Sequence, residues 1–151
     1  METKGIELEL ARKGSNGIEG RISYSFQNVK NTLTDAEIPN SPNQLGKANL
    51  ILPLYMKKIF LGIEELYTSE KLTLAGQTAQ NIGLPGIYTD QYYLTNLTLS
   101  SRDFMTKGLD LSASISNLFD KPYNDPGRPE HLQDMIQQDG ISYRIKVTIQ
   151  F

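Results

Sequence analysis

The sequence of 151 residues contains no cysteine and no tryptophan, and it has a single histidine. Without cysteine the chain cannot form a disulfide scaffold, a thiol nucleophile or a zinc–thiolate site. The net charge of −2 and the pI of about 5.4 give no basic surface for nucleic acid, so no nucleic-acid partner is expected. No run of about 18 apolar residues is present, which excludes a transmembrane helix of ordinary composition.

What the sequence does have is a two-residue alternation of apolar and polar side chains. The last eleven residues, ISYRIKVTIQF, show it most clearly, because apolar or aromatic residues alternate there with polar ones. The apolar set is Ile141, Tyr143, Ile145, Val147, Ile149 and Phe151. A strand points successive side chains to opposite faces, so the pattern predicts a strand with one apolar and one polar face.

Similar alternation recurs along the whole chain and predicts seven strands. They lie at about 6–11, 18–27, 44–54, 58–68, 92–100, 108–119 and 141–151. Most of them are roughly 10–11 residues long, the length that a tilted strand needs to cross a bilayer. Two positions disturb the pattern. Pro53 suits the end of its strand because it cannot donate to the ladder, and Glu65 shares the apolar parity, which predicts a place near the rim.

The predicted connections alternate between short and long. Short turns lie at about 12–17, 55–58 and 101–107, and long loops at about 28–43, 68–90 and 119–140. All short turns fall at the end that also holds the C-terminus, as in membrane barrels, which have short periplasmic turns and longer outer loops. The pattern therefore favours an all-β, antiparallel up-and-down transmembrane β-barrel segment.

Seven strands do not make a complete membrane barrel. The smallest ones have about eight strands, and an open sheet leaves two edges unpaired. The chain is therefore interpreted as about seven strands of a larger barrel, or as a chain that pairs with others. A different class stays open: a soluble β-barrel-like ligand-binding module with an apolar interior, completed by oligomerisation.

Several segments resemble TonB-dependent outer-membrane receptors. They are Asn117-Leu118-Phe119-Asp120-Lys121-x-Tyr123, the Gln138-Asp139-Gly140 turn, the terminal Phe151, KGIELEL near the start and Ser41-Pro42 before the third strand. The resemblance covers essentially the whole chain, and iron–siderophore receptors are the most similar subtype. It implies that residues 1–151 are the C-terminal part of a plugged barrel of about 22 strands.

The resemblance also implies partners and a location. The plug domain, TonB box and signal peptide of such receptors are absent from the sequence, so Met1 is expected to be an internal methionine, a truncated gene start or a cloning boundary. The expected location is the outer membrane of a Gram-negative cell, in contact with its lipid, with a periplasmic C-terminus. The TonB complex would act only through the missing plug, and the solute taken up would be a ferric chelate such as an iron–siderophore complex. No enzymatic activity and no cofactor are expected.

The resemblance assigns a role to the last strand. Its apolar positions, Tyr143, Ile145, Val147, Ile149 and Phe151, match the C-terminal signal that the barrel-assembly machinery reads in this family. The physical basis would be strand addition, in which backbone hydrogen bonds give affinity and alternate side chains give specificity. The other interpretation is a strand that ends on Phe for packing only.

Other candidate sites lie in the long loops. Tyr88, Tyr92 and Tyr93 are predicted to form an aromatic girdle at the membrane interface. His131 with Glu130 and Asp134 suggests a metal site, but zinc usually takes about three or four preorganised ligands, so a hydrated loop is favoured. The acidic residues of the 119–140 loop could also form an outer gate for a ligand, but an ordinary hydrated loop is again favoured. These residues are Asp120, Asp125, Glu130, Asp134 and Asp139. Pro129 to Ile136 is predicted to include a helical turn.

Overall fold

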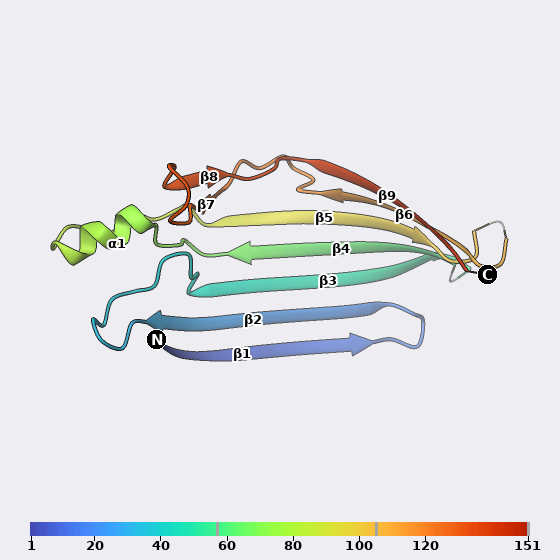
Figure 1. Cartoon of the computed structure of the whole chain (residues 1–151). Helices are drawn as coiled ribbons and strands as arrows, with labels where there is room; N and C mark the ends of the chain where they lie inside the picture. Colours follow the sequence, from blue (N-terminus) through green and yellow to red (C-terminus); the bar gives the residue numbers. More distant parts are fainter. Residues whose placement is uncertain (57, 105, 151) are drawn as a thin grey trace.

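The computed structural model describes residues 1–56, 58–104 and 106–150 (Figure 1). Seven strands form one antiparallel sheet in the order β1-β2-β3-β4-β5-β6-β9. They are β1 (Glu2–Lys13), β2 (Glu19–Lys30), β3 (Gln44–Tyr55), β4 (Ile59–Thr68), β5 (Tyr92–Ser101), β6 (Leu109–Ser116) and β9 (Ser142–Ile149). Each strand of the sheet pairs with the one that precedes it in the sheet order, so the prediction of an all-β, up-and-down segment is confirmed.

The two ends of the sheet differ as the loop lengths predict. The short turns and the C-terminal end of β9 lie at one end, and the three long connections lie at the other (Figure 1). The long connections carry α1 (Leu74–Asn81) and a small hairpin of β7 (Asn124–Pro126) and β8 (Met135–Gln137). Among the described residues, no helix is long and apolar enough to cross a membrane.

The prediction of a helical turn between residues 129 and 136 is wrong. That segment closes the β7–β8 hairpin, where the Gly127 N–H donates to the Asp134 carbonyl at 2.8 Å. The helix lies in the preceding long loop instead, where the Thr73 hydroxyl accepts the Gly76 N–H at 2.9 Å as an N-cap. Gly76 allows the helix to pack closely, because a Cβ at this position would collide with the Ile87 backbone.

The strand register joins the apolar positions into one face. The row Leu61–Leu99–Ala113–Ile145 runs across β4, β5, β6 and β9 through directly paired residues. Side chains on this face remain open to the surroundings: Leu8 is 65% exposed and Ile145 is 81% exposed. Few apolar side chains are buried, and they lie mainly near the long-loop end (Val29, Leu72, Tyr92 and Leu94). An exposed apolar surface of this extent needs a lipid or protein partner.

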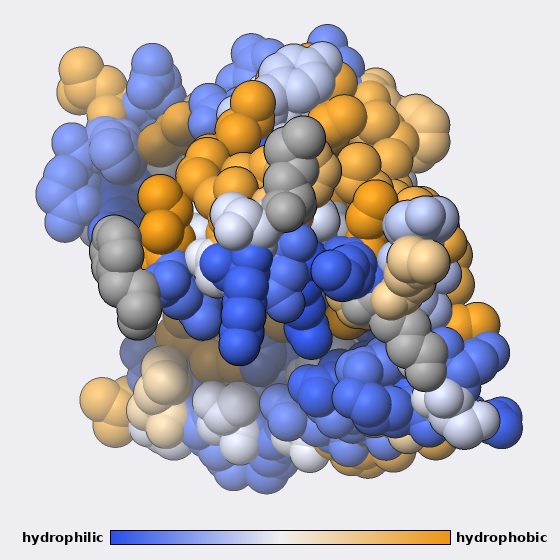
Figure 2. All heavy atoms as spheres, turned by 90° about the vertical axis from the view of Figure 1, so that its right-hand side faces the viewer, coloured by the Kyte–Doolittle hydropathy of each residue, from blue (hydrophilic) through white to orange (hydrophobic). Residues whose placement is uncertain are grey.

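The opposite face is mostly polar and is concave. Residues of all five strands from β1 to β5 line one cavity of about 810 Å³ on this side. Figure 2 looks along the sheet from the short-turn end: hydrophilic residues gather in the middle of the view, and apolar residues lie outside them. The sheet therefore has the curvature and the polarity of a barrel wall whose inner side is wet.

Both edges of this wall are open. Within the described residues, β1 and β9 each pair with a strand on one side only. Pro53 lies near the end of β3, where the register with β4 shifts between Pro53 and Tyr55, as its missing N–H predicts. Glu65 lies opposite Ala48 and Thr95 on the apolar face, three residues from the end of β4 at Thr68, as its parity predicts.

Candidate functional site

The candidate site is the hollow of the inner face together with the loops above it. Charged residues line this hollow of about 810 Å³, including Glu7, Glu9, Lys47 and Asp125, and apolar and aromatic residues such as Leu45, Leu66, Leu94 and Tyr92 stand beside them. Charged groups of both signs and an aromatic surface allow non-covalent recognition of a polar solute by hydrogen bonds, ion pairs and stacking.

A chain of polar contacts runs across the inner face and stiffens it. Lys47 Nζ lies 2.7 Å from Glu64 Oε2, and Asn96 Nδ2 donates to Glu64 Oε1 at 3.0 Å. The side-chain oxygen of Asn96, Oδ1, in turn accepts a hydrogen bond from the backbone N–H of Asn117 at 2.9 Å. Strands β3, β4 and β5 are therefore linked through their side chains up to the point where the last long loop begins.

The three long loops, 31–43, 69–91 and 117–141, are tied together and form what we call the loop cluster. Loops 31–43 and 69–91 meet where the Tyr88 hydroxyl donates to Glu37 Oε2 at 2.9 Å and the Asn40 N–H donates to the Leu72 carbonyl at 2.9 Å. Loop 117–141 joins where Asp134 Oδ1 accepts the Ala75 N–H at 2.9 Å. These contacts converge on the 69–91 loop, which holds the other two.

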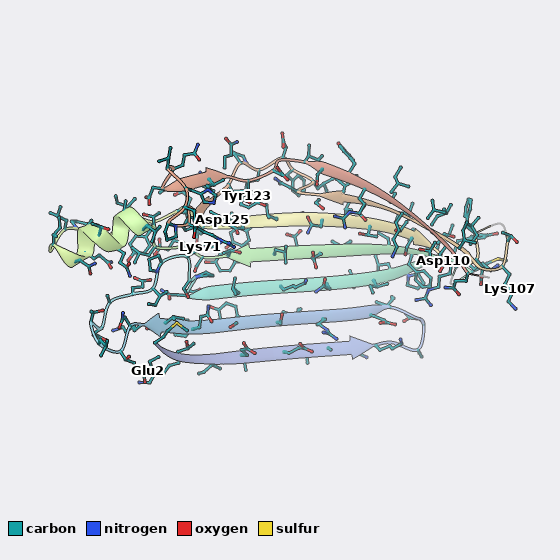
Figure 3. All side chains as sticks on the ribbon, in the orientation of Figure 1. Glu2, Lys71, Lys107, Asp110, Tyr123 and Asp125 are labelled. Atoms are coloured by element: carbon teal, nitrogen blue, oxygen red, sulfur yellow. The ribbon has the colours of Figure 1, made fainter. Side chains whose placement is uncertain are left out.

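The most buried ion pair of the loop cluster joins Lys71 and Asp125. Lys71 Nζ lies 2.6 Å from Asp125 Oδ1, and the two side chains are 10% and 33% exposed. The Tyr92 hydroxyl also donates to Asp125 Oδ1 at 3.3 Å, and the Tyr123 ring packs 4.5 Å from the Tyr92 ring. Figure 3 shows Lys71, Asp125 and Tyr123 together at the long-loop end of the sheet.

Burial and pairing act in opposite directions on Lys71. Burial alone lowers the pKa of its ammonium group, but the hydrogen bond and charge of Asp125 and the nearby Tyr92 exceed that effect, so the pKa is raised above 10.5. Lys71 is therefore charged at neutral pH and holds the carboxylate of Asp125. Burial and the Glu37 carboxylate likewise raise the pKa of Tyr88, which keeps this phenol protonated as a donor.

Asn117 explains the NLFDKPY segment in structural terms. Its backbone has a positive φ of 51°, and the residue is 4% exposed. Its side-chain amide donates to the Lys121 carbonyl at 2.9 Å and accepts the Lys121 N–H at 2.9 Å, which closes the turn. Asp120 then accepts the Ile141 N–H at 2.8 Å and so anchors the start of β9. A Cβ at Gly140 would collide with this Asp120 carboxylate, which accounts for the glycine.

Substitution of Asn117 is expected to weaken this turn through two separable effects, the loss of its side-chain hydrogen bonds and the strain of a positive φ. Asn117→Ala should destabilise the folded chain by about 2–3 kcal/mol, because it removes two hydrogen bonds and places alanine at positive φ. Asn117→Gly keeps the backbone conformation accessible and should cost about half as much. Guanidinium unfolding of the full chain in detergent micelles, followed by far-ultraviolet circular dichroism, measures both. Equal losses for the two variants would contradict the role of the positive φ.

The structure separates the three tyrosines that the sequence groups together. Tyr93 lies on the apolar face, 57% exposed, with its ring 4.7 Å from that of Tyr67. Tyr92, its neighbour on the strand, points to the opposite face and is 8% exposed. Tyr88 lies inside the loop cluster, where it bonds to Glu37 and Gln80. The three do not share one surface, and a membrane-interface position stays a prediction for Tyr93.

The residues of the predicted C-terminal signal share the apolar face of the open edge strand. Tyr143, Ile145, Val147 and Ile149 are all more than half exposed in β9, and their partners in β6 are Ile115, Ala113, Leu111 and Leu109. Phe151 lies outside the described residues. Recognition of this strand by the assembly machinery stays a prediction.

Three of the five acidic residues of loop 117–141 have structural partners. Asp125 and Asp134 hold loop 69–91, Asp120 holds Ile141 of its own loop, and His131 is exposed. Among the described residues, no three histidine or acidic side chains are placed to hold a metal ion. The sequence alone does not identify Lys71 as a partner of Asp125, because no local pattern around Lys71 marks a contact 54 residues away.

Comparison with known proteins finds similar folds among solved structures. No protein-family model and no curated protein sequence matches the chain. Among solved structures, it is similar to FpvAI in a complex with pyocin S2, with a TM-score of 0.73. It is also similar to the ferripyoverdine receptor of the outer membrane of Pseudomonas aeruginosa bound to ferripyoverdine, and to FpvA of P. aeruginosa bound to heterologous pyoverdines, each with a TM-score of 0.72.

These similarities extend over the whole chain but over a small part of the receptors. Each covers 99% of this chain and 19% of the receptor chain, at 15% sequence identity. At this identity the comparison establishes the fold. The resemblance seen in the sequence is confirmed at that level: the chain has the fold of a segment of these receptor chains.

Proposed function

We propose that this chain is the C-terminal wall of a TonB-dependent outer-membrane receptor with a larger barrel. One observation carries the proposal: among the described residues, a continuous apolar face over seven strands backs a mostly polar inner face with a hollow, and both sheet edges are open. The long loops gathered at one end and the fold shared with FpvA over 99% of the chain support it further. In this proposal the apolar face contacts outer-membrane lipid, and neighbouring strands of the receptor pair with β1 and β9.

The proposed solute is a ferric chelate of the siderophore type. The similarity to a receptor bound to ferripyoverdine supports this class, and so does a hollow with aromatic residues and charged residues of both signs. The loop cluster would form part of the outer mouth, and the short turns and C-terminus would face the periplasm. Coupling to the TonB complex would need a plug domain from the rest of the receptor, and the assembly machinery would act on β9.

The proposal is tested in cells of the source organism. The reading frame should continue through roughly 2 kilobases upstream of Met1 and encode further alternating strands and a plug domain, given that the chain covers 19% of FpvA. Quantitative mass spectrometry should find peptides of the chain in the outer-membrane fraction, and they should increase severalfold when the chelator 2,2′-bipyridyl removes iron. Peptides in the outer membrane that do not respond to iron would contradict the ferric solute but not the receptor.

The alternative of a soluble module completed by oligomerisation has a distinct expected result. Such a module must cover its apolar face with a second copy, so it would remain in the aqueous fraction and run as a defined oligomer without detergent. This outcome would contradict the receptor proposal as a whole.

A further inference from the structure

A shallow groove of about 390 Å³ crosses the apolar face of β1 to β4. Small residues form part of it: Ala48, and Gly20, at which a Cβ would meet no atom within 4 Å. Larger apolar side chains, including Leu10, Ile22 and Ile63, stand beside them. The groove is thus a local depression in a surface that is otherwise covered by bulky side chains.

The strand register tilts this groove across the sheet. Leu10, Ile22, Ala48 and Glu65 form one row of directly paired residues across β1 to β4. Leu10 lies three residues from the short-turn end of β1 at Lys13, whereas Glu65 lies three residues from the long-loop end of β4 at Thr68. The groove therefore climbs from the short-turn end of the wall toward the long-loop end, and its two ends carry opposite charges.

Arg12 marks the short-turn end of the groove. It pairs with Gly20 in the register and is exposed on the apolar face. The neighbouring cations on the inner face have partners, since Lys13 pairs with Glu19 and Arg21 Nε lies 3.8 Å from Glu9. With the other described residues, the Arg12 side chain makes no ion pair or hydrogen bond. A free guanidinium beside an apolar groove is complementary to an anionic group attached to an acyl chain.

We propose that the groove binds a glycerophospholipid of the periplasmic leaflet, with its phosphate on Arg12 and one acyl chain along Gly20 and Ala48. The guanidinium fork matches two phosphate oxygens. Glu65, which accepts a hydrogen bond from the Thr95 hydroxyl at 2.7 Å, repels a phosphate at the other end and so sets the direction of the lipid. This inference rests on the proposed membrane location and orientation of the wall.

The test uses the full chain in dodecyl maltoside micelles, with native mass spectrometry to count bound dioleoylphosphatidylglycerol. Arg12→Gln should weaken binding about tenfold, since it removes a charge-assisted phosphate contact. Gly20→Val should weaken it by a similar factor, because its side chain fills the groove without changing charge. Lys13→Gln is the matched control: it removes the same charge from the next residue on the other face, and binding should stay within about twofold.

Two further ligands separate the contribution of the phosphate to binding from that of the acyl chains. Dioleoylglycerol, which lacks the phosphate, should bind wild type and Arg12→Gln equally weakly, and millimolar inorganic phosphate should not displace the phospholipid. Equal phospholipid binding by wild type and Arg12→Gln, or an equal loss in Lys13→Gln, would overturn the inference. Circular dichroism of the same samples, with and without detergent, separates the lipid site from the proposed membrane wall. A chain that keeps its strand signal without detergent contradicts the membrane wall itself, whereas a chain folded in micelles without selective binding contradicts only the lipid site.

Discussion

Leu97→Arg is expected to destabilise the folded chain in a phospholipid bilayer by about 2–4 kcal/mol, the cost of an arginine at the lipid-facing midplane of a barrel. Leu97 lies in the middle of β5, and its paired neighbours on the apolar face are Ile63 and Ile115. The residues paired directly with Leu97 are therefore apolar, and the nearest polar residues on this face are Glu65 and Thr95, one pair further toward the long-loop end. Guanidinium titration of the full chain in bilayers of dilauroylphosphatidylcholine, followed by circular dichroism, measures the loss.

Thr98→Arg is the matched control for this prediction. Thr98 is the next residue of the same strand, but it lies on the inner face, where its paired neighbours are Gly62 and Ser114 and a cavity of about 310 Å³ is open. An arginine there stays hydrated, and the expected change is below about 1 kcal/mol. Equal effects of the two substitutions would show that the apolar face is not the one in contact with lipid.

Asp125→Asn is expected to be the most damaging change to a charged residue of the loop cluster. It leaves the Lys71 ammonium, whose side chain is 10% exposed, without its carboxylate, at a cost of about 2 kcal/mol. This estimate is below the range for fully buried pairs because the Asp125 side chain is 33% exposed. Hydrogen exchange should accelerate at the amides that join the neighbouring segments, such as the Thr89 N–H, which donates to the Lys71 carbonyl at 2.9 Å.

Two comparisons test this explanation. Lys71→Met should cost less than Asp125→Asn, because the remaining carboxylate can reach water whereas the remaining ammonium cannot. Asp35→Asn breaks the pair with Lys30, in which the aspartate side chain is 85% exposed, and should change stability by less than about 1 kcal/mol. If Lys71→Met proved the more damaging change, burial of the ammonium would not be the cause.

The same pair gives the loop cluster a dependence on alkaline pH. The pKa of Lys71 is raised in the folded chain, so its contribution to stability is complete below the ordinary value of 10.5 and is lost as the pH rises through the higher folded value. Amide exchange in loop 69–91, corrected for its intrinsic pH dependence, should therefore increase above about pH 10.5 in wild type. Asp125→Asn should show this increase at lower pH, because it removes the partner that raises the pKa.

Particular residues show how far the sequence predicts this structure. The alternation of side chains along a strand assigns both Glu65 and Ile145 to the apolar face, because neighbouring side chains must point to opposite faces. The same rule places Tyr92 and Tyr93 on opposite faces, so a single girdle containing both conflicts with the alternation itself. The helix at Leu74–Asn81 also has a local signal, the capping Thr73 before alanine and glutamine residues, whereas the 129–136 segment has a proline but becomes a hairpin connection.

The sequence by itself determined the seven strands of the large sheet, their two faces, the short and long connections and the up-and-down order, because each depends on neighbours within a few residues. Only the tertiary structure decided the register, and with it the tilted groove between Arg12 and Glu65. It alone brought Lys71 to Asp125 and gathered three loops into one cluster. The physical reason is distance along the chain: alternation is a local property of a strand, whereas a contact between loops depends on how far each strand has shifted against the next.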